Sequence, residues 1–298
     1  MPQIQVDWDN YVFRCHYFGE LMTKPTGKTN FDKYNEAKAR QTQLFEKIGG
    51  MKDGITKDNA LMTFSQICNK VDALKLIKDK PNLSLTAKRR LVQIYTEETT
   101  GRVKDIQNIY LEKGLKVEED CITLYSLRTG LYYKKNRERI NNGFVTGEID
   151  FEDVEKDMTI DTKGSWDIFT FDATVASQIN PLYWWQGQMY MWLKKRKLHR
   201  VAYCLINTPD EMIRRMEYQL KNNFIGSQEE FEEAKILLRA KHTYEDLSLE
   251  RKIRIYEFDR NDAKIELAKS YIPYFREYLK NITNTKLEED EQFNEDAE

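Results

Sequence analysis

The sequence predicts an α/β protein, in which a mixed central sheet is flanked by helices and preceded by a helical elaboration. Residues 30–110 are rich in helix formers, whereas short β-type runs alternate with helical stretches after about residue 105. Such an alternation is typical of helices packed on the faces of one sheet. Hydrophobic residues make up 40% of the 298 positions and charged residues 32%, which indicates a soluble globular chain.

The N-terminal region, residues 1–104, is predicted to be mostly helical and to pack on or beside the core. Asn30 is a candidate cap for a helix that stops at a Gly-Gly pair. Two further helices are expected, and Ser84 and Gly101 are candidate boundaries of the second. The basic triplet KRR at 88–90 fits either a solvated helix face or a nucleic-acid contact, because charge alone specifies little.

The core is predicted over residues 105–285. The range in which its first helix is expected begins slightly earlier. The expected order is one helix, three strands, a helix, a strand, two helices, a strand and a closing helix. In that order the elements are expected within residues 103–130, 131–140, 143–154, 157–171, 181–197, 200–209, 209–222, 228–242, 251–260 and 261–281. Asn-Asn-Gly at 141–143 is the turn signal between the first two strands.

The C-terminal stretch, residues 286–298, is strongly acidic. It holds seven acids and one lysine, and removing its charge of −6 from the overall −2 leaves +4 for the rest of the chain. With so few apolar residues we expect this tail to be disordered. It either serves solubility or competes with a polyanion for basic surface.

Several classes of protein are excluded by simple patterns. No run of 18 apolar residues predicts a membrane span, and the first residues lack the basic and apolar regions of a secretory signal. The cysteines, at 15, 68, 121 and 204, are scattered without a CxxC pair, which disfavours zinc or iron–sulfur ligation. We therefore expect reduced thiols and a cytoplasmic location.

A cluster of charged residues on two neighbouring predicted strands forms the candidate site. Asp161 and Lys163 lie two apart and so face the same way on a strand, as do Glu148 and Asp150 on the strand before it. The loop between the strands has hairpin length, which would place Asp150 beside Asp161. Two adjacent carboxylates resist ionisation unless a divalent cation such as Mg²⁺ or Mn²⁺ binds them.

The role of Lys163 is left open by the pattern alone. Its ammonium could neutralise the carboxylate pair structurally, or it could hold or help deprotonate a water and steady charge on a phosphate. A plain surface ion pair is the simplest alternative. Downstream, Gln186 and Tyr190 lie i, i+4 on one face of an aromatic-rich helix, where a buried glutamine needs hydrogen-bond partners.

These residues form an ordered series of motifs. The series resembles the PD-(D/E)XK nuclease superfamily, specifically its branch of RecB-type and phage lambda exonuclease-like enzymes. The resemblance covers roughly residues 105–210 and implies a restriction-endonuclease-like core. The motifs are G-x-x-x-E at Gly114–Glu118, G-x-x-D at Gly147–Asp150, D-x-K at Asp161–Lys163 and Q-x-x-x-Y at Gln186–Tyr190.

The resemblance implies a role for each matched residue. Glu118, Asp150 and Asp161 would be ligands of one or two Mg²⁺ or Mn²⁺ ions, with the Thr162 carbonyl as an additional ligand. Lys163 would position the attacking water. The helix pair Gln186 and Tyr190 would support the site and touch the DNA strand. Glu119 adjoins Glu118, and only the spacing from the glycine selects Glu118.

The function that the resemblance implies is a metal-dependent DNA exonuclease that acts on linear double-strand ends during recombination or repair, in bacterial or phage-infected cytoplasm. Expected partners are DNA, a single-strand annealing or recombination protein and other copies of the chain, with no membrane and no iron–sulfur cluster. A structure-selective or restriction-type endonuclease and a non-catalytic DNA-binding module are the alternatives. The basic run KKNRER at 134–139 fits either a phosphate grip or a solvated strand edge.

Overall fold

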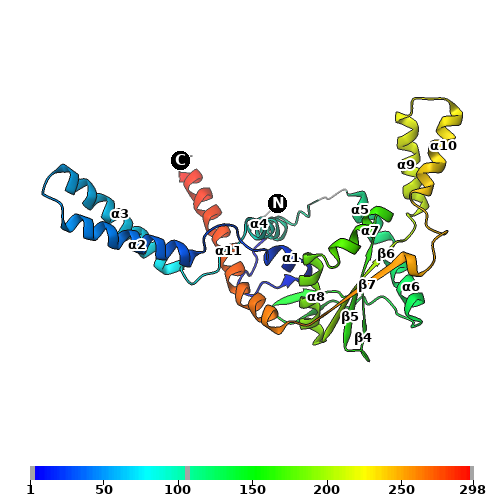
Figure 1. The fold of residues 1–298 in the computed structure, drawn as a ribbon, viewed down its shortest axis with the longest axis horizontal. Coiled ribbons are helices and arrows are strands. Elements are labelled where there is room, and N and C mark those ends of the chain that lie inside the picture. The colour runs from blue at the N-terminus through cyan, green and yellow to red at the C-terminus, as the bar shows by residue number, and fades with distance from the viewer. Residues whose placement is uncertain (1–3, 105–107, 296–298) are drawn as a thin grey trace. The chain divides into compact units, whose positions relative to one another are not determined.

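A mixed four-stranded sheet lies at the centre of the fold (Figure 1). The computed structural model describes residues 4–104 and 108–295, and side chains as far as residue 284. The strand order is β4-β5-β6-β7, in which β5 and β6 are parallel and both outer pairs are antiparallel. The strands are β4 (Phe151–Asp153), β5 (Met158–Gly164), β6 (Leu198–Cys204) and β7 (Ile253–Asp259).

A second, smaller sheet connects the start of the chain to the segment that precedes β4. Its order is β1-β3-β2, with β1 parallel and β2 antiparallel to β3. The strands are β1 (Phe13–Arg14), β2 (Ile140–Asn141) and β3 (Val145–Gly147). The first residues of the chain therefore belong with the sheets, although the sequence pattern assigned them to a helical region.

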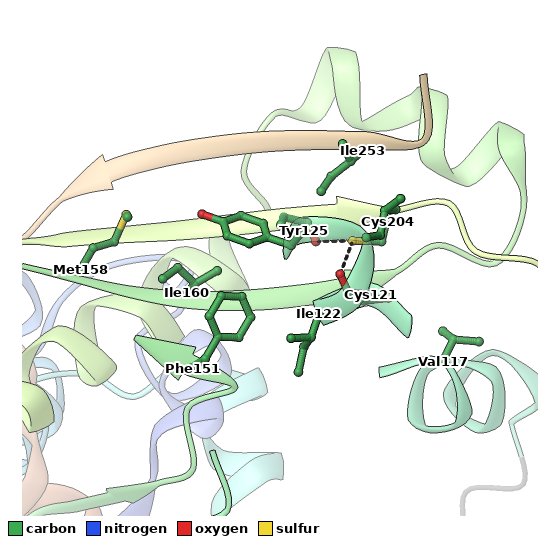
Figure 2. Packing of buried hydrophobic residues seen from close by; sticks show 11 residues of the cluster. Val117, Cys121, Ile122, Tyr125, Phe151, Met158, Ile160, Cys204 and Ile253 are labelled. Carbon is green, nitrogen blue, oxygen red and sulfur yellow. Dashed lines mark hydrogen bonds between the residues drawn. The ribbon is translucent and has the colours of Figure 1, made fainter. Parts of the chain in front are cut away.

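Helices cover both faces of the central sheet because the side chains of its strands alternate. Met158 and Ile160 of β5 pack with Cys121 and Tyr125 of α6 (Glu118–Thr129), as Figure 2 shows. The neighbouring positions on β6, such as Tyr203, pack with α7 and α8 instead. These helices are α7 (Ile168–Ser177) and α8 (Pro181–Lys194). Residues of β5 that alternate with Ile160 therefore face α8.

Four more elements belong to this part of the chain. Before α6 lies α5 (Ile109–Lys116), separated from it by Val117. After β6, two helices form a hairpin, α9 (Asp210–Asn223) and α10 (Gln228–Ala240), and the short η2 (Glu250–Lys252) leads into β7. Ser227 caps α10 through a capping box with Glu230, which explains why the hairpin turns there.

Contacts divide the chain into two units that differ from the predicted domains. The first comprises residues 1–19 and 96–269, and the second residues 20–95 and 270–298. The second unit contains the antiparallel helices α2 (Asn30–Gly49) and α3 (Ile55–Ile77). The three boundaries fall within α1 (Phe18–Leu21), α4 (Leu85–Thr100) and α11 (Asp262–Glu295), and η1 (Cys15–Tyr17) comes directly before α1. None of them coincides with residues 104 and 285.

Most predicted elements are confirmed, and three strand predictions need correction. Residues 143–154 form two short strands, β3 and β4, so Glu148 and Asp150 lie between strands rather than on one. Of residues 131–140, only Ile140 is in a strand, because the basic side chains there contact carboxylates and Asn136 bonds the Asp150 backbone in place of a ladder. The strand predicted over residues 157–171 ends at Gly164, and α7 begins at Ile168. Asp167 caps α7 in a capping box with Thr170, so the apolar run that follows is helical.

The helical predictions need smaller corrections. The cap of α2 is Thr29 rather than Asn30, whereas Ser84 accepts a hydrogen bond from the Ala87 amide as expected of a cap. The backbone of α11 is helical as far as Glu295, through most of the tail that composition predicts to be disordered. Extending an existing helix through helix-forming Glu, Lys and Leu requires no new nucleus. Residues 296–298 lie outside the described part.

Within the described residues, none of the helices combines the length and the apolar character needed to cross a membrane.

Candidate active site

The candidate site is built on the face of β5 that α8 covers. Asp161 and Lys163 alternate with Ile160, which points to the opposite face. The Lys163 ammonium lies 5.0 Å from the centre of the Tyr183 ring of α8, and it forms an ion pair with Asp161. Asp161 is 2% exposed. This ion pair is therefore not the plain surface feature that the pattern allowed.

Asp150 joins this pair through the hairpin. Phe151 pairs with Ile160, and continuing that register places Asp150 opposite Asp161. The Thr162 amide and hydroxyl donate to Asp150 Oδ2 over 2.6 and 2.9 Å. The structure therefore brings together the two carboxylates that the sequence placed on adjacent strands.

The electrostatics of the pair follow from this crowding. Burial, and then the Asp161 charge, raise the pKa of Asp150 to about 6. Burial alone would lower the pKa of Lys163, but the Asp161 and Asp150 carboxylates together raise it above its usual range. Lys163 therefore remains an ammonium group at neutral pH. In this state it can orient a water or stabilise negative charge, but it cannot accept a proton.

Glu118 lies apart from this pair. It is the first residue of α6, and Oε2 accepts a hydrogen bond from Lys135 Nζ over 2.7 Å. Among the described residues, no three acidic, imidazole or thiol side chains lie close enough to hold a metal ion together. The predicted three-carboxylate set is therefore not assembled, and the assignment of Glu118 and of the Thr162 carbonyl remains a prediction.

A glycine brings the start of α6 close to the end of β5. A Cβ atom on Gly164 would lie 2.7 Å from Cγ2 of Val117, the residue before Glu118, so only glycine fits without displacement. In contrast, a Cβ atom on Gly114, the glycine of the first motif, would meet nothing within 4 Å. The close approach that positions Glu118 thus depends on Gly164.

Gln186 and Tyr190 form a buried hydrogen-bond chain. Gln186 Nε2 donates to the Tyr190 hydroxyl over 2.8 Å, and that hydroxyl donates to the Glu148 carbonyl over 3.0 Å. Burial and the Asp161 charge raise the pKa of Tyr190, so it remains protonated and can serve as this donor. The helix pair therefore holds the Gly147–Asp150 segment in place, which is the supporting part of the predicted role.

The basic segment 134–139 is tied to the backbone of the same segment. The Asn136 amide donates to the Asp150 carbonyl over 2.6 Å, and its side chain donates to the Ile149 carbonyl over 3.0 Å. Around it, Lys135 pairs with Glu118, Arg137 with Glu119 and Arg139 with Glu148, at 2.7, 3.3 and 3.6 Å. Three basic side chains of the segment that binds the Asp150 backbone are thus each paired with a carboxylate.

The donor set fits a divalent cation in part. Two close carboxylates and one ammonium leave a net negative charge in a mostly buried place, and hard oxygen donors suit Mg²⁺ or Mn²⁺. Asp150 and Asp161 would hold the ion, while Glu118 could contribute only after releasing Lys135.

Sequence reasoning missed three positions that organise the site. Tyr183 lies three residues before Gln186 on the same helical stripe, so the spacing could have identified it. Asn136 and the role of Gly164 depend on contacts between distant segments. No local pattern in the sequence indicates such contacts.

Comparisons with known proteins give a likeness of fold. No protein-family model and no curated protein matches the chain. A solved phage-related exonuclease from Haemophilus somnus 129PT superimposes with a TM-score of 0.61 and 22% identity, over 93% of this chain and 96% of that one. An alkaline exonuclease from Laribacter hongkongensis, LHK-Exo, gives a TM-score of 0.49 at 12% identity, and 13% in its complex with dAMP, over 70% of this chain and 88% of that one.

The match to the phage-related exonuclease spans nearly the whole of both chains. It confirms the predicted fold class, an α/β restriction-endonuclease-like core with a mixed sheet and added helices. The resemblance seen in the sequence motifs and the likeness in three dimensions therefore agree, and the chain has the fold of that exonuclease.

Proposed function

We propose that the chain is a divalent-metal-dependent DNA exonuclease that hydrolyses phosphodiester bonds at double-strand ends. The observation that carries the proposal is the largely buried group of Asp150, Asp161 and Lys163, in which the hairpin places the two carboxylates side by side and the Lys163 ammonium pairs with Asp161. The fold shared with a phage-related exonuclease supports it.

Each residue would contribute in a distinct way. A divalent cation, when bound, supplies Lewis-acid chemistry: it makes water more acidic and offsets negative charge on a phosphate. Asp150 and Asp161 bind that cation. The Lys163 ammonium orients water through a hydrogen bond and stabilises the charge that develops on the phosphate.

The surrounding residues position this group and the substrate. Gln186 and Tyr190 hold the Glu148 carbonyl, which fixes the loop that carries Asp150. The basic segment 134–139, anchored by Asn136, offers its cations to the DNA backbone. Contacts of this kind give salt-dependent binding that does not depend on sequence.

The biological setting belongs to the same proposal. End digestion supplies single-stranded tails, so we propose a role in recombination or repair, with a single-strand annealing protein as partner and with self-association of the chain. A phage origin would accord with the phage-related exonuclease that shares the fold.

The deciding experiment compares linear and closed circular DNA, each incubated with Mg²⁺ or with EDTA. Degradation of linear DNA only, and only with Mg²⁺, is the expected result. Cutting of circles would instead indicate a structure-selective or restriction-type endonuclease. Gel retardation without any cutting would indicate a non-catalytic DNA-binding module.

A further inference from the structure

A concave site lies in the second unit. Its pocket has a volume of about 600 Å³, which is within the usual range for sites that bind small molecules or single nucleotides. The wall is made by residues 25–28, the start of α2, the turn after α3, the start of α4 and one face of α11. None of these segments contributes to the candidate active site.

The charge of this lysine-lined pocket is positive. Four lysines and one glutamate line it, a net charge of +3. The lysines are Lys28, Lys33, Lys80 and Lys88. Two form ion pairs: Lys80 lies 2.6 Å from Glu277 in the pocket, and Lys28 lies 2.7 Å from Glu36 outside it. Counting both carboxylates against the four ammonium groups still leaves a surplus of two positive charges, which favours an anionic ligand.

One wall of the lysine-lined pocket is aromatic. Tyr274 and Tyr278 lie i, i+4 on α11, so both project from the same face of that helix. Both side chains are only partly buried. An accessible aromatic ring surrounded by lysines is the combination on which successive bases of a single strand stack while its phosphates are neutralised.

Hydrogen bonds between segments that are distant in the sequence hold the walls of the pocket together. The Asn30 amide donates to Asn82 Oδ1 over 3.0 Å, and the Asn82 side chain donates to the Lys28 carbonyl over 3.1 Å. The Asn30 side chain donates to the Lys80 carbonyl over 3.1 Å. These bonds hold the loop before α2 against the turn after α3, so two of the four lysines are fixed in position by their backbones.

The KRR triplet at 88–90 is partly explained by this pocket. Lys88 lines it, whereas Arg90 is bound by Glu20.

A duplex presents its bases edge-on and stacked inside, so the tyrosines could reach a base face only on unpaired DNA. Among anionic ligands, the aromatic wall thus favours a single strand over a duplex or a bare phosphate.

We propose that the lysine-lined pocket binds single-stranded DNA, with Lys33 and Lys88 against phosphates and Tyr278 against a base. The identity of the ligand as DNA rests on the proposed function, while the polarity and shape of the site do not. The pocket would hold the unpaired strand that an end-processing nuclease generates.

The test measures anisotropy of a short fluorescent oligothymidylate on the full chain in EDTA, with Lys163→Ala as the common background so that no cleavage occurs. Lys33→Glu with Lys88→Glu should weaken binding at least about tenfold and reduce its salt dependence, because phosphate contacts are lost. Tyr278→Ala should weaken binding by about tenfold through lost stacking. The matched control is Lys47→Glu with Lys75→Glu, the same charge change on α2 and α3 outside the pocket.

Photocrosslinking of an oligonucleotide that carries 5-bromodeoxyuridine tests the pocket in protein whose pocket residues are unchanged. It therefore remains informative if a pocket variant fails to fold. Crosslinks within residues 274–278 support the proposal. Equal affinity of the pocket and control variants, or crosslinks confined to residues 96–269, would overturn it. Failure of the proposed function shows separately, as absence of cleavage by the wild-type chain with Mg²⁺.

Discussion

Lys135 Nζ lies 2.7 Å from Oε2 of Glu118, and each side chain is about a quarter exposed. The two residues come from different segments, one from the basic run before β2 and one from the start of α6. In the proposed metal site, a metal ion and Lys135 would compete for the same carboxylate. A DNA phosphate would offer Lys135 another anion, so substrate binding and completion of that site would be coupled through this pair.

Replacing Lys135 by Met should strengthen metal binding. A partly exposed ion pair is worth on the order of 1 kcal/mol, so removing this competitor should lower the dissociation constant for Mn²⁺ by about fivefold. Calorimetric titration with Mn²⁺ in the absence of DNA measures the change. Lys134→Met, one residue away in the same segment, is the control. Identical affinities in both variants would show that Glu118 takes no part in metal binding.

Replacing Lys163 by Ala should abolish cleavage and spare DNA binding. In the proposed mechanism the ammonium stabilises charge at the reacting phosphate, a contribution worth about a hundredfold or more in rate. Single-turnover cleavage of a linear duplex measures the loss, and gel retardation in EDTA measures binding. Lys197→Ala, a lysine that is 82% exposed after α8, is the matched control. Wild-type rates in the Lys163→Ala protein would contradict the role assigned here.

Replacing Asp150 by Asn should stabilise the metal-free protein near neutral pH. The pKa of Asp150 is raised from 3.8 to about 6, so the folded state binds this proton more tightly than the unfolded state does. Its contribution to stability is complete below about pH 4 and is lost as the pH rises to about 6, a loss of roughly 3 kcal/mol. Asparagine has no such proton and retains an acceptor for Thr162.

Urea unfolding in EDTA at a series of pH values measures this difference. The wild-type free energy of unfolding should fall between pH 4 and 6 relative to that of the variant, and added Mn²⁺ should restore only the wild type. Parallel curves for the two proteins would mean that folding does not raise the pKa of Asp150.

The sequence was sufficient for those parts of the site that one hairpin or one helix determines. Asp150, Asp161 and Lys163 converge because strand alternation and hairpin length dictate it, and Gln186 bonds Tyr190 because i, i+4 residues share a helix face. Glu118 lies on a separate helix, whose approach depends on packing at Gly164. No local periodicity reports a close contact between residues about fifty positions apart.

The same limit explains the errors in the fold. The run at 131–140 has residues typical of a strand, but its partners are carboxylates on α6 and the backbone near Asp150. The apolar residues after Trp166 fit a strand equally well by composition, and the capping box at Asp167 decides for a helix. Local composition thus predicted the type of most elements, whereas side-chain contacts determined the structure of these two segments.

Replacing Tyr190 by Phe should reduce both stability and cleavage. The change removes the hydroxyl that bonds Gln186 and the Glu148 carbonyl, and leaves a buried donor and acceptor without partners. The free energy of unfolding should fall by about 1–3 kcal/mol. Adding Gln186→Leu to the Tyr190→Phe protein removes the donor that has lost its partner. The double variant should therefore recover part of the stability but not the cleavage rate. Additive losses of stability in the double variant would argue against the hydrogen-bond chain.

Replacing Gly164 by Ala should impair metal binding and cleavage far more than replacing Gly114, although only Gly114 belongs to one of the motifs. At Gly164 the new methyl group would lie 2.7 Å from Cγ2 of Val117, and relieving that overlap must move the start of α6 and Glu118 with it. At Gly114 the methyl group meets nothing within 4 Å, and alanine in a helix should add about 0.5–1 kcal/mol of stability. Thermal melting and Mn²⁺ titration of both variants measure the contrast. A Gly164→Ala protein with wild-type metal affinity would show that the position of Glu118 does not depend on this close approach.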